Sequence, residues 1–409
     1  MFVPILFSIM ALVIPLVILR SFSQRHKIYL VGIIIGHLIM MYVLHFRLVK
    51  QTGYPIVVDI HSDCQKYFDN TRHFSGRAPF EVGLLDARDA AEGSNHFGYH
   101  YVLAVMWTIS SHPALAVRLF KTLLFFAGLS CVTRVWRRHY GESLAFGGCV
   151  FLGLFFTPAF YYNYRNLKDG LILALFLFIM ALLDTLIQSR TSSSRIQSKN
   201  KVIFGWSAVL VLLYFLSTLR MYIPAIIVVA LILHTVMSLR IEMQKRLALI
   251  MVISSIVFIG FTTTFMQNMM EMGGASRISL TAFLSLRTIL QAFLSPIPWG
   301  MITYYEPMNV FFYSIYWLLL PFALYCLIRH LISSFDWHFF LYLMITYTVG
   351  VVIGDPPRKR LIVYPILVMW VLAHLAYRRS MQAAQQEFEY QIDEQQLLYN
   401  SEYYREGEC

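Results

Sequence analysis

Two aspartates, Asp63 and Asp169, are the residues of this chain best placed to do chemistry. Asp63 lies in the polar segment 47–95, and Asp169 comes directly before a long apolar run. A polar loop of this length between apolar runs is usually functional, and a carboxylate in it can act as a general base that accepts a proton from a hydroxyl. Two structural alternatives stay open: Asp63 as a solvated loop acid, and Asp169 as a helix N-cap, where a carboxylate suits the helix dipole.

Basic residues beside other apolar runs predict a second feature, a phosphate site. They are Arg165, Lys168, Arg220, Arg358, Lys359 and Arg360. The forked guanidinium of arginine bonds two phosphate oxygens at once, so these residues suit a phosphate or pyrophosphate at the membrane surface. Anchoring to lipid headgroups is the alternative for the run 358–360. We also expect Asp59, His61 and Tyr67 to line the loop that meets the substrate.

The composition is that of an integral membrane protein. Hydrophobic residues make up 58% of the 409 residues and charged residues 13%, whereas a soluble domain carries about 25% charged residues. The net charge is +11, but the basic residues do not form a separate soluble domain. Nucleic acid is therefore excluded as a partner, and the bases either set orientation or meet membrane lipids.

Eleven apolar runs approach the length of about 20 residues that a helix needs to cross a bilayer. They cover residues 2–19, 29–46, 114–133, 143–162, 170–188, 202–219, 222–239, 247–266, 309–328, 338–354 and 361–377. The sequence therefore predicts an all-α polytopic membrane protein with about 11 transmembrane helices. Residues 1–378 form the transmembrane domain, with long outer loops at 47–113 and 267–308, and residues 379–409 form an acidic cytoplasmic tail.

The distribution of bases predicts the orientation. Arg20, Arg25 and Lys27 follow the first run rather than precede it, which is the reverse of a cleavable signal peptide. With the N-terminus outside and the C-terminus cytoplasmic, five inner connections hold fourteen bases and the short outer ones hold six, as the positive-inside rule requires. We expect a multi-pass protein of the cell membrane, in a bacterium the inner membrane.

The segment 99–111 is apolar but has only about 13 residues, too few to span a bilayer. We predict a helix lying on the outer surface. If it spanned the membrane instead, the orientation of everything after it would reverse.

No cofactor is predicted. The spacings of the five cysteines fit neither a disulfide framework nor a zinc site, and the histidines match no usual ligand pattern, so a divalent metal has no support. Glycine-rich phosphate loops and a Ser/His/Asp nucleophile motif are absent from the sequence as well.

A series of short motifs resembles the GT-C superfamily of membrane glycosyltransferases, which includes protein-mannosyltransferase-like and aminoarabinose-transferase-like enzymes. The motifs are Asp63-x-x-x-Tyr67, His112-Pro-Ala-Leu-Ala-Val-Arg118, Thr157-Pro158 and Lys168-Asp169, and the resemblance covers roughly residues 29–240. The chain departs from the family pattern in an extra leading run at 2–19 and in having no large C-terminal domain on the outer side.

The resemblance implies a sugar donor on polyprenyl phosphate or pyrophosphate, surface helices in the first outer loop, and acids at the positions of Asp63 and Asp169. Asp63 would then take the proton of an acceptor hydroxyl, Asp169 would orient the acceptor, and the outer bases would offset charge on the leaving phosphate. The acceptor, whether glycan, lipid or protein, is not implied.

Two rival functions stay open. An O-antigen-polymerase-like or ligase-like enzyme would transfer a lipid-linked oligosaccharide and would place its main catalytic loop late, at 267–308. A transporter or scaffold without chemistry would show charges deep within its spans, whereas here they collect mostly at span ends.

Overall fold

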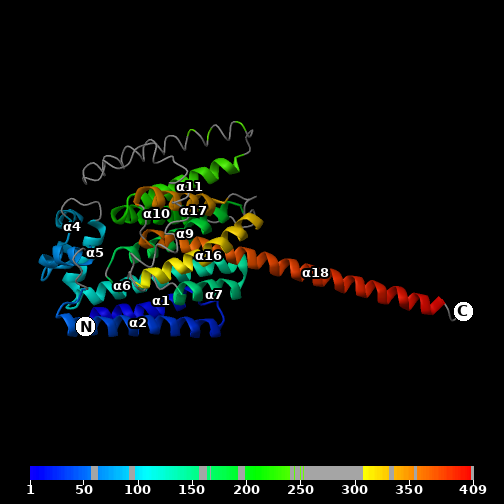
Figure 1. Cartoon of the computed structure of the whole chain (residues 1–409), viewed down its shortest axis with the longest axis horizontal. Helices are drawn as coiled ribbons and strands as arrows, with labels where there is room; N and C mark the ends of the chain where they lie inside the picture. The colour runs from blue at the N-terminus through cyan, green and yellow to red at the C-terminus, as the bar shows by residue number, and fades with distance from the viewer. Residues whose placement is uncertain are drawn as a thin grey trace.

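The structure is a computed structural model that describes residues 1–56, 63–91, 97–155, 164–165, 167–191, 199–239, 307–330, 336–353 and 357–406, with the single residues 244, 249 and 252. Within these ranges every regular element is a helix (Figure 1). The elements are α1 (Phe2–Ile18), α2 (Gln24–Thr52), α3 (Asp63–Asn70), η1 (Arg72–Phe74), η2 (Pro79–Glu81), α4 (Leu84–Ala90), α5 (Phe97–Ile109), α6 (Pro113–Tyr140), α7 (Glu142–Val150), η3 (Phe151–Phe155), α9 (Asp169–Thr191), α10 (Lys199–Leu219), α11 (Tyr222–Ser238), α16 (Pro307–His330), α17 (Trp337–Ile353), η6 (Pro357–Val363) and α18 (Tyr364–Glu406). The all-α prediction is confirmed for the described part of the chain.

Helices occupy ten of the eleven predicted apolar runs, wholly or in their described part, and the run 247–266 lies almost entirely outside the described residues. Five described helices are long and apolar enough to cross a membrane: Gln24–Thr52, Pro113–Tyr140, Asp169–Gln188, Asn200–Leu219 and Arg360–Gln395. Shorter apolar helical stretches, of 10 to 17 described residues, lie at Phe2–Ile18, Glu142–Leu154, Tyr222–Ser238, Ser314–Arg329 and Trp337–Thr346. A membrane protein of many helices is supported, and the number of eleven spans stays a prediction.

The helix α6 is the centre of the bundle. It packs against α1, α2, α5, α7 and α9, and 83% of its most apolar stretch is buried, against 33% for α2. Because lipid tails are as apolar as leucine, helices in a membrane associate through close packing of small residues. Gly128 is such a residue, since a Cβ atom built on it would lie 2.9 Å from the carbonyl oxygen of Ala174 in α9.

Two contacts show which segments share an end of α6. The N-terminal ammonium group donates to Ser111 Oγ at 3.3 Å, just before α6 begins. The backbone N–H of Ser23 donates to the Glu142 carboxylate at 2.7 Å, just after α6 ends. The first loop, with α3, α4 and α5, therefore lies at the end of the bundle where α1 begins, here called the loop end (Figure 1).

The segment predicted to lie on the surface forms α5, a helix of 13 residues. At a rise of about 1.5 Å per residue it extends roughly 20 Å, less than the roughly 30 Å of a bilayer core. It contacts α3, α4, α6 and α10, and Tyr99, His100 and Leu103 are buried there. Its length and packing agree with a helix that covers the loop end.

The last helix, α18, has 43 residues and continues without a break into the predicted acidic tail. Its first part packs against α16, α7 and α6. Its second part projects away from the bundle (Figure 1), and the side chains from 377 to 395 are exposed or nearly so. Up to residue 395 the tail is thus an exposed extension of a packed helix.

Adding a methyl group at Gly128 is expected to destabilise the protein, because the Ala174 backbone cannot move aside without separating α6 from α9. We predict that Gly128→Ala lowers the free energy of unfolding by about 1–3 kcal/mol, the usual cost of overpacking. Gly147→Ala in α7 is the matched control, since nothing lies within 4 Å of its added Cβ. Denaturation in mixed micelles measures both, and equal stability of the two variants would contradict the close approach.

Candidate functional site

The helix α3 carries Asp63 and Tyr67 one turn apart, so both side chains lie on one face. Tyr67 is buried, while Asp63 keeps partial exposure. The Tyr67 ring meets two rings of α5 edge-on: its centroid lies 5.3 Å from that of Tyr99 and 5.1 Å from that of His100. These contacts dock α3 on α5 and place Asp63 at the rim of the loop end.

Arg118, in the second turn of α6, is fully buried and ties three segments together. Its Nε donates to the carbonyl oxygen of Tyr164 at 2.6 Å, and its Nη2 donates to that of Pro55 at 2.9 Å. Its Nη1 lies 2.8 Å from His45 Nδ1 of α2. Because arginine is always a donor, His45 Nδ1 must accept, so the imidazole is neutral with its proton on Nε2.

Lys121, one turn further along α6, is also fully buried. Its ammonium group donates to the carbonyl oxygen of Leu167 at 3.0 Å. It also lies 5.8 Å from the centre of the Tyr99 ring, within the range of a cation–π interaction. Lys121 therefore fixes the short segment before α9 against the first loop.

The predicted pair Lys168-Asp169 begins α9 and faces two other elements. Lys168 Nζ lies 5.5 Å from the centre of the Tyr67 ring, which connects it directly to α3. The Asp169 carboxylate forms a buried ion pair with Arg220, which lies between α10 and α11. Arg220 Nη1 also donates to the Tyr222 hydroxyl at 3.0 Å. These contacts bring four predicted site residues together, Tyr67 with Lys168 and Asp169 with Arg220.

Among the described residues, more basic than acidic side chains are buried at the loop end. Arg118, Lys121, Lys168 and Arg220 are 0%, 0%, 5% and 4% exposed, and Asp169 is 2% exposed. We call these five residues the cation cluster. By side-chain type, four of these five buried residues are basic and one is acidic. A site of this kind attracts an anion.

Cys64, the second residue of α3, is buried beside the cation cluster. Burial raises the pKa of its thiol to about 11, against the opposing influence of Lys121, Arg165 and Arg118. The thiol is therefore protonated at neutral pH and is a poor nucleophile. The same influence shows that Arg165 lies near α3 as well.

The structure brings together Tyr67, Lys168, Asp169 and Arg220, with Arg165 close by. Arg360 is buried on η6 against the ring of Tyr316 at 5.0 Å, and η6 packs against α9. Asp59 and His61 lie outside the described residues, and so do the side chains of Arg358 and Lys359. The predicted late loop 267–308 falls almost wholly outside them too.

Sequence reasoning did not select Lys121 or His45 for the site, and it noted Arg118 only as the end of a motif. A usable signal was present, because Arg118 and Lys121 fall inside the predicted span 114–133. Ionisable residues inside a span are rare and commonly functional. Nothing in the sequence pairs His45 with Arg118, since 73 residues separate them.

Comparison of the chain with protein-family models, with curated proteins and with solved structures finds no match. The site therefore has to be interpreted from its own residues. In the described ranges, no group of three or more His, Cys, Asp or Glu side chains is arranged to hold a metal ion. The chemistry that these side chains offer is binding of an anion beside a partly exposed carboxylate.

Replacing Asp169 by asparagine is expected to destabilise the protein strongly, because Arg220 would keep a buried charge without its counterion. Breaking a buried pair from one side costs about 3–5 kcal/mol. The control is Glu142→Gln. Glu142 pairs with Arg137 at 3.0 Å, and the two side chains are 24% and 34% exposed, respectively. An ion pair this exposed contributes about 0–1 kcal/mol to stability. Denaturation in mixed micelles compares the two variants. Similar losses of unfolding free energy in the two variants would show that the buried Asp169–Arg220 pair stabilises the protein no more than an exposed pair does.

Proposed function

We propose that the protein is an integral membrane glycosyltransferase that moves a sugar from a polyprenyl-phosphate-type lipid to an acceptor on the extracytoplasmic side. The observation that carries the proposal is the cation cluster beside α3, the helix that begins with Asp63. A lipid phosphate supplies the anion that the cluster attracts, and Asp63 supplies a base at its rim. The resemblance to the GT-C superfamily suggests how the two act together.

Lys168 and Arg165 are the proposed contacts for the donor phosphate. Lys168 lies against the Tyr67 ring, and Tyr67 shares a helix face with Asp63. Arg165 is near enough to Cys64, the neighbour of Asp63, to influence its thiol. Arg118 and Lys121 point their donors at backbone carbonyls, so their proposed part is to hold the segment 164–168 in place and to make the site positive.

In the proposed reaction Asp63 takes the proton of an acceptor hydroxyl. The acceptor oxygen forms a bond to the anomeric carbon of the sugar while the bond from that carbon to the phosphate oxygen breaks. The lipid phosphate leaves with the electron pair of the broken bond. Lys168 and Arg165 offset the growing negative charge on it, because fixed cations stabilise charge that develops in the transition state.

Asp169 is proposed as a positioning residue. Its carboxylate is buried and engaged with Arg220, so it acts through the arginine rather than as a proton acceptor. The pair joins the start of α9 to the turn between α10 and α11. It thereby sets the position of Lys168, the residue next to it.

The rival enzyme, an O-antigen-polymerase-like or ligase-like protein, would use the same lipid-phosphate chemistry with a catalytic loop at 267–308. It stays an alternative because that loop lies almost wholly outside the described residues. A transporter would move its cargo without loss of the lipid phosphate. The product of the reaction separates these possibilities: a transferred monosaccharide, a transferred oligosaccharide, or an unchanged donor.

Asp63→Asn is expected to abolish transfer while donor binding persists, because asparagine keeps the shape but cannot take the proton. A positioned general base contributes about 10²–10⁴ in rate, so turnover with a lipid-linked sugar should fall by that factor. Asp89→Asn is the matched control, an exposed aspartate on α4 in the same loop. Full transfer by the Asp63 variant would remove this residue from the mechanism.

Lys168→Met is expected to weaken binding of the donor rather than the chemical step. Loss of one hydrogen bond from a charged group, worth about 1.5–3 kcal/mol, raises the dissociation constant of polyprenyl phosphate about ten-fold or more. Arg88→Met on α4 removes an exposed charge as a control. Binding by purified protein in micelles measures the effect. Equal affinities for wild type and the Lys168 variant would refute the phosphate assignment.

A further inference from the structure

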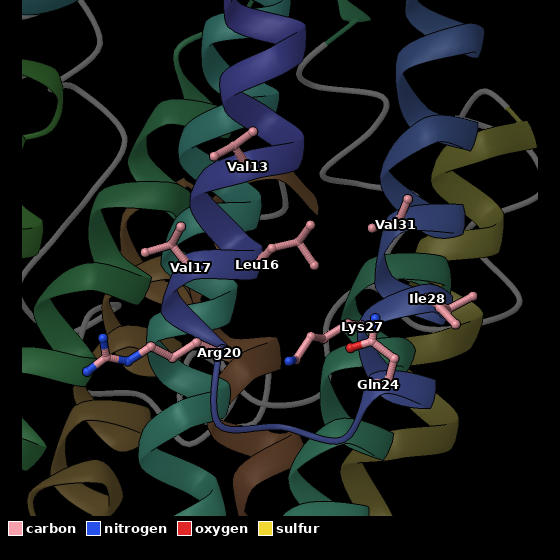
Figure 2. Close-up of a pocket in the computed structure, with 8 residues that line it drawn as sticks. All are labelled: Val13, Leu16, Val17, Arg20, Gln24, Lys27, Ile28 and Val31. Carbon is pink, nitrogen blue, oxygen red and sulfur yellow. The ribbon is translucent and has the colours of Figure 1, made fainter.

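A groove between α1 and α2 lies at the end of the bundle opposite the proposed active site. It has a volume of about 480 Å³ and is lined by Val13, Leu16, Val17, Arg20, Gln24, Lys27, Ile28 and Val31. Figure 2 shows Leu16 of α1 and Lys27 of α2 directed into the space between the two helices, whereas the Arg20 side chain at the end of α1 extends away from α2. The volume falls within the roughly 300–1,000 Å³ of small-molecule sites.

The groove is amphipathic along its length. The walls in the body of the two helices are valine, leucine and isoleucine, and the polar lining residues gather at the turn that connects α1 to α2 (Figure 2). Val17 and Ile28 are more than half exposed, so this surface of the bundle is open. An occupant must therefore have an apolar part and a polar part at one end.

The polar end of the groove carries available positive charge. Neither the Arg20 nor the Lys27 side chain forms a hydrogen bond or ion pair with the described part of the chain. Two neighbours at the same end differ, since Arg137 and His26 both pair with Glu142, at 3.0 Å and 2.9 Å. Arg20 and Lys27 thus remain positively charged residues that Glu142 does not neutralise.

We propose that this groove binds an anionic phospholipid of the inner leaflet. The acyl chain lies along the apolar walls of α1 and α2, and the phosphate lies at the Lys27 ammonium group, with Arg20 adding positive charge at the same end of the groove. The predicted orientation places the α1–α2 turn at the cytoplasmic surface, where anionic lipids give a negative surface potential. Ammonium and guanidinium groups form strong charge-assisted hydrogen bonds to phosphate.

A second copy of the chain is a poorer occupant. In a two-fold dimer the same patch faces itself, so the cations at the polar end of one groove would meet those of the other. That juxtaposition is repulsive, and it becomes favourable only when an anion lies between them. The two-fold dimer is therefore an outcome that the experiment must separate from lipid binding.

The test is native mass spectrometry of the full chain in detergent, titrated with phosphatidylglycerol or with phosphatidylcholine of the same acyl chains. Wild type is expected to bind phosphatidylglycerol more tightly than phosphatidylcholine. Lys27→Gln should weaken phosphatidylglycerol binding about five-fold, and Lys27→Gln with Arg20→Gln about twenty-five-fold, from the usual effect of one basic residue near anionic lipid. Arg25→Gln is the control, an exposed base in the first turn of α2 that bonds to the Tyr29 hydroxyl and does not line the groove.

Filling the groove tests the apolar part independently, since Val31→Trp leaves every charge in place and should weaken binding of phosphatidylglycerol. Equal affinities for the two lipids, or equal losses in the Lys27 and Arg25 variants, would overturn the proposal. The proposal would also be overturned if the wild-type chain formed a dimer without added lipid and Val31→Trp dissociated that dimer. Sugar transfer is not part of the readout, so the result is independent of the proposed function.

Discussion

Two buried cations near the start of α6 impose the constraint on which the loop end of this protein depends. Arg118 and Lys121 have no exposed surface, and a buried charge is tolerated only when polar groups surround it. The described partners are mainly backbone carbonyls, of Pro55, Tyr164 and Leu167. The chain just after α2, at Pro55, and the chain just before α9, at Leu167, therefore both lie against α6.

That constraint explains how residues far apart in the sequence come to share one site. Once the segment around 164–168 is held by Arg118 and Lys121, Lys168 meets the Tyr67 ring and Asp169 meets Arg220. The first loop is held from the other side, where Tyr67 packs on Tyr99 and His100 of α5. This packing of Tyr67 brings α3, the helix that begins with Asp63, beside the cation cluster.

The sequence predicted the helices well, because apolar runs of membrane length leave the backbone no alternative to internal hydrogen bonding. It also predicted that Asp169, Lys168, Arg220 and Tyr67 lie near one another, and two contacts, Lys168 with Tyr67 and Asp169 with Arg220, agree with that; their shared functional site stays a prediction. It could not predict the Asp169–Arg220 pair, which joins residues 51 positions apart, or the burial of Arg360 against Tyr316. Such pairings depend on which helices are neighbours, and hydropathy does not encode that.

The central claim is that the cation cluster and the bases beside it hold the phosphate of a lipid donor next to Asp63. The most direct measurement is an electron cryomicroscopy structure of the full chain in lipid nanodiscs with an added polyprenyl phosphate. We expect phosphate density at the loop end, with a phosphate oxygen about 3 Å from a side-chain nitrogen of Lys168 or Arg165, as a hydrogen bond requires. Phosphate density at the opposite end of the bundle, with the loop end empty, would contradict it.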